Sequence, residues 1–148
     1  MEDSMWENIV DFHNKFKIPQ SEVPSLELVG GLLDFRVKFM QEELEEFIEA
    51  LALGNDVKAF DALIDLVYVA MGTAFVCQFP WQEGWQTVHA ANMTKRRVAH
   101  ESESKRGSIY DIVKPEGWIS PERELAAIIT LHARRLKRTQ LVMKESLR

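Results

Sequence analysis

The 148-residue chain is poor in the residues that build cross-linked or turn-rich folds. Its one cysteine, Cys77, lies in an apolar run, which excludes an intrachain disulfide, disfavours a thiolate metal site and predicts a buried side chain. Seven glycines and five prolines favour neither disorder nor a turn-rich all-β fold. No stretch approaches the roughly 18 apolar residues of a membrane helix, and no basic segment leads into an apolar run at the amino terminus. We therefore expect a soluble, cytoplasmic protein.

Apolar residues recur at helical spacing through most of the chain, in which hydrophobic residues make up 46% and charged residues 28%. The predicted helices cover about residues 5–18, 26–53, 55–77 and 81–97, with a last helix from Pro121 and a polar loop over residues 100–120. Net charge is −5, yet residues 132–148 carry six Lys or Arg and one Glu. The sequence predicts an all-α fold in one domain, residues 1–148: a helical bundle on an antiparallel hairpin, with a basic C-terminal helix.

Two acidic clusters flank the predicted hairpin turn at Gly54. Glu43 and Asp65 each lie eleven residues from Gly54, and Glu46 and Ala62 each lie eight, so the clusters should face each other at the same height. Glutamates alone are typical of a solvated helix face, but two aspartates, Asp61 and Asp65, on an apolar helix need a bound cation or a basic partner such as Arg36. Oxygen ligands of this kind suit Mg²⁺ or Mn²⁺.

Spacing excludes several other chemistries. No histidine has the Glu-x-x-His spacing of a carboxylate-bridged di-iron bundle, no His-Asp pair exists, and no glycine-rich loop precedes a Lys-Ser or Lys-Thr pair. Magnesium held by carboxylates alone shares its shell with waters and substrate phosphates. The acids therefore point toward phosphate chemistry.

The motifs of the chain resemble those of one known family. They are Glu42-Glu43-x-x-Glu46, Asp61–Ala70, Phe12-His13 with Ile18-Pro19, Val88–Lys95 and Lys114–Trp118. Together they resemble the MazG-like, all-α nucleoside triphosphate pyrophosphohydrolases, in particular the small single-domain phage and bacterial members.

The resemblance implies magnesium-dependent cleavage of a nucleoside triphosphate to the monophosphate and pyrophosphate, with Mn²⁺ able to substitute. Glu43, Glu46 and Asp65 would hold metal, and Glu42 would position or deprotonate the attacking water, with a further metal as an option. The chain departs from the family pattern at position 62, where Ala62 replaces an acid and Asp61 is the nearby substitute. A homodimer or homotetramer is also implied.

Substrate-binding residues are predicted before and within the loop at residues 100–120. Asn92 and Lys95 lie one helical turn apart and would face the phosphates, although basic residues at this point also complement a helix C-terminus. Core packing is the alternative for the aromatic candidates, and a structural role is the alternative for the histidine. The further predicted substrate residues are Phe12, His13, Lys114 and Trp118.

A rival hypothesis makes the chain a non-catalytic oligomerisation or nucleic-acid-tethering module that uses its basic C-terminal helix. Its leucines, however, are typical of a packing helix with a solvated basic face. Within the enzyme hypothesis, the sequence leans toward a deoxynucleotide, handled for nucleotide-pool control or to supply a monophosphate. It does not rank dUTP, dCTP, dGTP and modified nucleotides.

Overall fold

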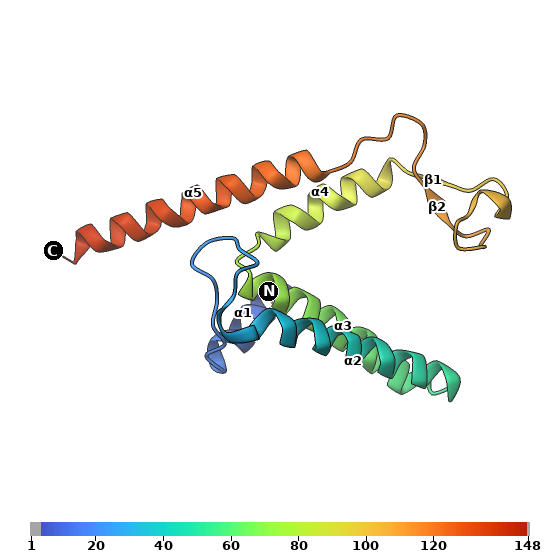
Figure 1. The fold of residues 1–148 in the computed structure, drawn as a ribbon, viewed down its shortest axis with the longest axis horizontal. Coiled ribbons are helices and arrows are strands. Elements are labelled where there is room, and N and C mark those ends of the chain that lie inside the picture. The colour runs from blue at the N-terminus through green and yellow to red at the C-terminus, as the bar shows by residue number, and fades with distance from the viewer. Residues whose placement is uncertain (1–3, 148) are drawn as a thin grey trace. The chain divides into compact units, whose positions relative to one another are not determined.

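The computed structural model describes residues 4–147 and confirms the all-α fold class. Its elements are α1 (Met5–Lys15), η1 (Val29–Gly31), α2 (Leu32–Ala52), α3 (Asp56–Val76), α4 (Trp81–Met93), β1 (Arg96–Arg97), η2 (Glu101–Glu103), β2 (Ile112–Val113) and α5 (Glu122–Ser146) (Figure 1). They form two compact units. The hairpin unit comprises the chain up to Trp81 together with the segment from His132, and the pocket unit comprises Gln82–Leu131. The expectation of one domain stays a prediction.

Helices α2 and α3 form the antiparallel hairpin predicted from the sequence and lie side by side (Figure 1). Gly54 makes the turn with φ +61°, and the Asn55 side chain caps α3 by accepting a hydrogen bond from the backbone N–H of Lys58. Buried residues recur every seventh position on both helices, as in a coiled-coil seam. These residues are Arg36, Glu43 and Ala50 on α2 and Ala62, Val69 and Val76 on α3.

The carboxyl end of α3 lies in the core of the hairpin unit. Ile9 of α1 joins Met71, Phe75, Val76 and Cys77 of α3 and its end in one buried cluster. The expected burial of Cys77 is confirmed, and this burial raises the pKa of its thiol. The packing of α1 against α3 therefore anchors the N-terminal helix to the hairpin.

The segment between α1 and α2 caps the end of α3. The backbone N–H groups of Ser21 and Ser25 donate to the carbonyls of Val76 and Cys77, at 2.9 and 3.0 Å. Helix α2 begins six residues later than expected, because Gly30 and Gly31 have φ of +55° and +73° and the preceding residues are not helical. The hydrogen bonds from Ser21 and Ser25 satisfy carbonyls that the carboxyl end of α3 leaves free.

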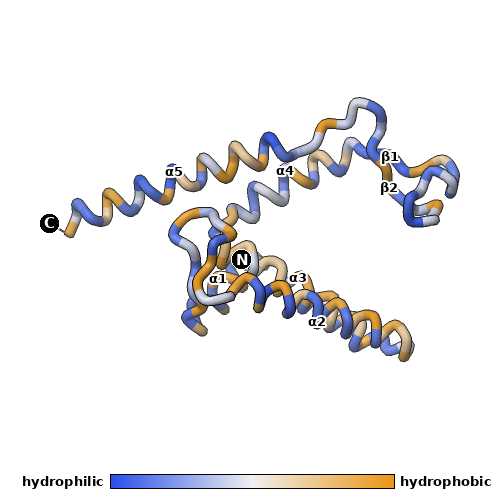
Figure 2. Tube along the Cα trace, viewed as in Figure 1, coloured by the Kyte–Doolittle hydropathy of each residue, from blue (hydrophilic) through white to orange (hydrophobic). Residues whose placement is uncertain are grey.

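Helix α3 is more apolar than expected from the sequence. Its 21 residues contain a window of mean hydropathy 1.7, long and apolar enough to cross a membrane, contrary to the expectation that no segment approaches this limit. This is weak evidence for a membrane helix, because the core helix of a soluble protein meets the same criterion. Apolar residues run along α3 in Figure 2, and four of those in its first half are exposed: Val57, Phe60, Leu63 and Ile64.

The pocket unit contains a small sheet where an irregular loop was expected. Helix α4 starts after Pro80 as predicted but ends at Met93, and β1 then pairs antiparallel with β2. Asp111, only 7% exposed, accepts hydrogen bonds from the side chains of Ser104 and Arg106 and from the backbone of Ile112. The bonds from Ser104 and Arg106 lower the pKa of Asp111. A buried, satisfied carboxylate thus holds the loop, and α5 follows Pro121 as predicted.

Candidate functional site

The two acidic clusters face each other across the hairpin. Glu43 is 7% exposed, whereas Glu42, Glu46, Asp61 and Asp65 are exposed. The pKa of Glu43 is raised first by burial and then by the negative charges of Glu46, Asp65, Glu42 and Asp61. Acids from both helices therefore raise the pKa of one carboxylate, that of Glu43. This agrees with the expectation that residues equally far from Gly54 on α2 and α3 lie close together.

The Glu43 carboxylate lacks a partner within the described chain. Its Oε2 atom is buried without a hydrogen bond, and the nearest charges have the same sign. A hard divalent cation fits this all-oxygen donor set, because it would neutralise the crowded carboxylates and satisfy the orphan oxygen. Within residues 4–147, however, no three Asp, Glu, His or Cys side chains are placed closely enough to hold one ion. The donor chemistry fits, but the side chains do not form a closed ligand cage.

Arg36 is not the partner of the two aspartates. Its guanidinium is buried, and it donates from Nη2 to the Val69 carbonyl at 2.7 Å and from Nε to the Thr73 hydroxyl at 3.1 Å. The alternative in which Arg36 neutralises Asp61 and Asp65 is therefore not realised. Asp61 and Asp65 are instead exposed, and a bound cation stays a prediction for them.

Position 62 points into the hairpin rather than toward solvent. Ala62 is 2% exposed and belongs to the seam with α2, whereas the adjacent Asp61 is exposed. A side chain at position 62 leaves the backbone within the interface of α2 and α3, whereas the Asp61 side chain leaves it outside this interface. Asp61 is thus not a geometric replacement for the acid that the family pattern expects.

His13 is buried at the core end of the hairpin. Its Nδ1 donates to the Ile9 carbonyl at 2.7 Å, which leaves Nε2 as a buried acceptor without a partner. Burial, followed by the nearby positive charge of Arg36, lowers the pKa of His13. Because the side chain is only 1% exposed, this placement suits the structural role that the sequence left open.

Phe12 has a different environment from its neighbour. It is 39% exposed, and its ring meets Tyr68 edge-to-face with centroids 5.3 Å apart. Tyr68 lies one helical turn after Asp65 on α3. A pair made of exposed Phe12 and half-buried Tyr68 therefore adjoins the acid-bearing stretch of the hairpin.

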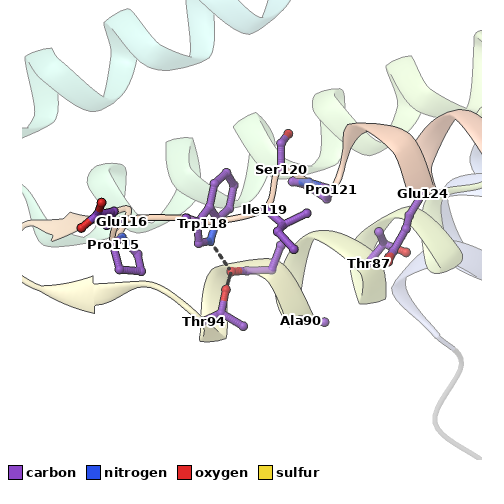
Figure 3. Close-up of a pocket in the computed structure, with 12 residues that line it drawn as sticks. Thr87, Ala90, Thr94, Pro115, Glu116, Trp118, Ile119, Ser120, Pro121 and Glu124 are labelled. Carbon is purple, nitrogen blue, oxygen red and sulfur yellow. Dashed lines mark hydrogen bonds between the residues drawn. The ribbon is translucent and has the colours of Figure 1, made fainter.

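Three of the predicted substrate residues meet in the pocket unit. The Nζ atoms of Lys95 and Lys114 lie 5.2 and 4.7 Å from the ring centroid of Trp118. Trp118 also lines a cavity of about 470 Å³ between the end of α4 and the start of α5 (Figure 3). Asn92 is exposed on the last turn of α4. The roles predicted for these residues stay predictions.

Some residues that shape these sites were not singled out from the sequence. Gly72 provides the space that Arg36 and His13 fill, and a glycine inside an apolar helix was the available signal. Thr87 and Glu124 line the cavity in the pocket unit, but nothing in their local sequence marks them.

Comparison with known proteins identifies the family of the chain. A family model described as phosphoribosyl-ATP pyrophosphohydrolase matches residues 9–92, more than half of the chain. No curated protein matches the chain. The matched region includes both acidic clusters and ends before Lys95, Lys114 and Trp118. The chain belongs to the phosphoribosyl-ATP pyrophosphohydrolase family, within the MazG-like superfamily of all-α nucleoside triphosphate pyrophosphohydrolases.

Proposed function

We propose that this pyrophosphohydrolase cleaves a nucleoside triphosphate, with a lean toward a deoxynucleotide, into the monophosphate and pyrophosphate. The observation that carries the proposal is the buried, unpartnered Oε2 of Glu43 with four further carboxylates around it. Such a group is costly in its ionised form unless it binds a cation, and triphosphate chemistry needs one. The cellular role is control of the nucleotide pool or supply of a monophosphate, in the cytoplasm of a bacterium or of a phage-infected host.

The acids divide between binding and proton transfer. Glu43, Glu46 and Asp65 would hold Mg²⁺, or Mn²⁺ in its place, with Asp61 and Glu42 as further ligands. When bound there, the ion would neutralise charge on the phosphates and lower the pKa of a bound water. Glu42, exposed beside Glu43, accepts the proton of the water that attacks the α-phosphorus, and the bond from that phosphorus to the oxygen of the departing pyrophosphate breaks. Asn92 and Lys95 bind the pyrophosphate that leaves.

A panel of triphosphates tests the reaction. Purified chain with Mg²⁺ is incubated with dUTP, dCTP, dGTP, dATP and the ribonucleotides, and monophosphate and pyrophosphate are measured. Phosphoribosyl-ATP belongs in the panel because the matching family model bears its name. Equal amounts of monophosphate and pyrophosphate from a deoxynucleotide support the proposal. Release from phosphoribosyl-ATP alone would assign that substrate instead, and release from none would overturn the proposal.

Glu43→Gln separates a catalytic role from a structural one. Turnover should fall by about 100- to 1,000-fold, as for other groups that stabilise reacting charge, while the unfolding midpoint stays equal or rises because a buried like-charge repulsion is removed. Glu45→Gln is the matched control, since Glu45 is exposed on the same helix and does not contribute to the raised pKa of Glu43. Full activity in Glu43→Gln would contradict the assignment.

An exposed apolar face on the hairpin supports self-association. Side chains roughly half or more exposed lie on both helices: Ile48, Leu51, Phe60, Ile64 and Val67. Exposed apolar side chains on neighbouring helices suit burial against a second copy of the chain, which would give the homodimer or homotetramer that the family resemblance implies.

The rival tethering function makes a different prediction. A module that binds nucleic acid through the basic segment of α5 has no reason to release pyrophosphate in a divalent-metal-dependent way. Metal-dependent pyrophosphate release that persists when Arg134 and Arg138 are changed to Gln would exclude the tether as the main function.

A further inference from the structure

Arg36 is a buried cation at the interface of the two hairpin helices. Its side chain is 4% exposed, and within residues 4–147 no carboxylate forms an ion pair with it. It occupies the seam position seven residues before Glu43, where a helix interface normally has an apolar residue. A charge buried without a counter-charge is less stable than a well-packed apolar side chain of similar size. Stability of the fold therefore does not explain an arginine at this position.

The guanidinium of Arg36 joins α2 to α3 by directed hydrogen bonds. Nη2 donates to the Val69 carbonyl at 2.7 Å, and Nε donates to the Thr73 hydroxyl at 3.1 Å. The Thr73 hydroxyl donates in turn to the Val69 carbonyl at 2.7 Å, so both acceptors lie on one turn of α3. Within the described part of the chain, no other side-chain hydrogen bond joins the two helices. Because the donors of a guanidinium are rigidly arranged, these bonds fix the position of α2 along α3.

Gly72 and His13 hold the guanidinium in place. A Cβ at Gly72 would lie 2.4 Å from Nη2 of Arg36 and 2.8 Å from Nε2 of His13, so both nitrogens lie close to the same point on α3. The His13 ring is itself fixed, because its Nδ1 donates to the Ile9 carbonyl at 2.7 Å. Helix α1 therefore closes the group that we call the Arg36 clamp: His13, Arg36, Val69, Gly72 and Thr73.

The Arg36 clamp lies in register with the acidic clusters. Arg36 and Gly72 are each eighteen residues from Gly54, whereas Glu43 and Asp65 are each eleven. The clamp is thus two helical turns, about 10 Å, beyond the acid pair on both helices. The turn at Gly54 fixes one end of the hairpin, and the clamp fixes the other. A slip of one residue between them would shift the acids by about 1.5 Å and rotate them by about 100°.

We propose that Arg36 is a positioning residue, which sets the axial register of α2 on α3 and thereby places Glu43 level with Asp65. A single polar residue in an otherwise apolar helix seam has this effect in coiled coils, where it fixes register at a cost in stability. The inference rests on the proposed function only for the cation that the acids hold. The register itself is measurable without that cation.

Arg36→Met tests the register directly. Methionine is unbranched and apolar, and the Val69 carbonyl keeps the hydrogen bond from Thr73, so the unfolding midpoint should be equal or higher. Nitroxide labels on the exposed pair Lys38→Cys and Lys58→Cys report the distance between the helices by double electron–electron resonance, in labelled chain diluted with unlabelled chain. The distance distribution should shift or broaden by about 1.5 Å or more when Arg36 is replaced. An unchanged distribution would overturn the inference.

Val76→Ala is the matched control for packing. Val76 is fully buried in the same seam, and its side chain makes no hydrogen bond. This variant should lower the unfolding midpoint but keep the distance distribution of the wild type. A broadening as large as that of Arg36→Met would show that any loss of packing loosens the register, and would refute a specific role for Arg36.

Binding of Mn²⁺ without nucleotide tests the consequence for the acids. In titrations followed by electron paramagnetic resonance, Arg36→Met should raise the Kd about tenfold, as expected when a contact that orients metal ligands is lost. Removal of a positive charge by itself would lower the Kd, so the sign of the change separates positioning from electrostatics. Lys38→Met, which removes an exposed charge from the same helix, is the control and should not raise the Kd. An equal or lower Kd in Arg36→Met would overturn the placement of Glu43 by Arg36.

Thr73→Val is an independent variant of the Arg36 clamp. It removes the acceptor of Nε and should raise the Kd for Mn²⁺ by less than Arg36→Met does. The double variant should bind Mn²⁺ no more weakly than Arg36→Met alone, because both changes remove the same clamp. Losses that add in the double variant would contradict the inference.

These outcomes are separable from those of the proposed function. A distance distribution that depends on Arg36, in a wild-type chain that releases no pyrophosphate, would sink the proposed function and leave the register role standing. Pyrophosphate release with a distance distribution that Arg36→Met leaves unchanged would do the reverse.

Discussion

Replacing Gly72 with alanine should destabilise the hairpin unit. A Cβ at this position would lie 2.4 Å from Nη2 of Arg36, and 2.6 and 2.8 Å from Cε1 and Nε2 of His13. Neither side chain is free to move: His13 is 1% exposed, and Arg36 is held by its hydrogen bonds to Val69 and Thr73. The clash therefore has to displace a buried guanidinium or a buried ring.

The magnitude follows from three opposing effects. Overpacking a filled core costs about 1–3 kcal/mol, and weakening hydrogen bonds of a buried charged group costs about 1.5–3 kcal/mol. Against these, alanine is about 1 kcal/mol better than glycine inside a helix. The expected net loss is about 1.5–5 kcal/mol in the free energy of unfolding, measured by urea denaturation followed by far-UV circular dichroism.

Gly84→Ala is the matched control because it makes the same substitution in a helix with space for it. The nearest atom to its added Cβ is Cδ2 of Leu125 at 3.8 Å, an ordinary contact. This variant should be as stable as the wild type or up to about 1 kcal/mol more stable. Equal stabilisation of Gly72→Ala and Gly84→Ala would refute the close packing of Arg36 and His13 against α3.

Three further predictions concern other parts of the chain. Burial lowers the pKa of His13 in the folded state, so below about pH 6.5 the unfolded chain binds a proton at this histidine more readily than the folded chain does. The free energy of unfolding should therefore fall as pH drops below about 6.5. In urea midpoints measured at about pH 7.5 and 5.5, His13→Asn should show a smaller pH dependence than the wild type. Asp111→Asn should loosen the loop that Asp111 holds and speed limited trypsin cleavage after Lys105, whereas Glu101→Gln should not; unchanged cleavage of Asp111→Asn would contradict the role given to this carboxylate. Ile64→Asp, on the exposed apolar face, should shift sedimentation toward a smaller species while helicity is kept, and an unchanged oligomer would place the interface elsewhere.

The hairpin and the pairing of its acids could be predicted from the sequence. Gly54 and Asn55 mark the turn by local chemistry, and residues equally far from it must meet when two helices run antiparallel. The raised pKa of Glu43, caused in part by Asp65, confirms that register. The small sheet was missed because two-residue strands have no periodicity and are stabilised by the buried Asp111 rather than by their own sequence.

The sequence by itself determined the helical class, the turn at Gly54 and the motifs that identify the family, because helix spacing, turn residues and motif order are all local properties of the chain. Only the tertiary structure decided which carboxylate is buried, that Arg36 bonds to Val69 and Thr73 instead of to an aspartate, and that two lysines share the ring of Trp118. Burial and partner choice depend on which helix faces meet across long sequence separations. Composition and spacing do not specify those contacts.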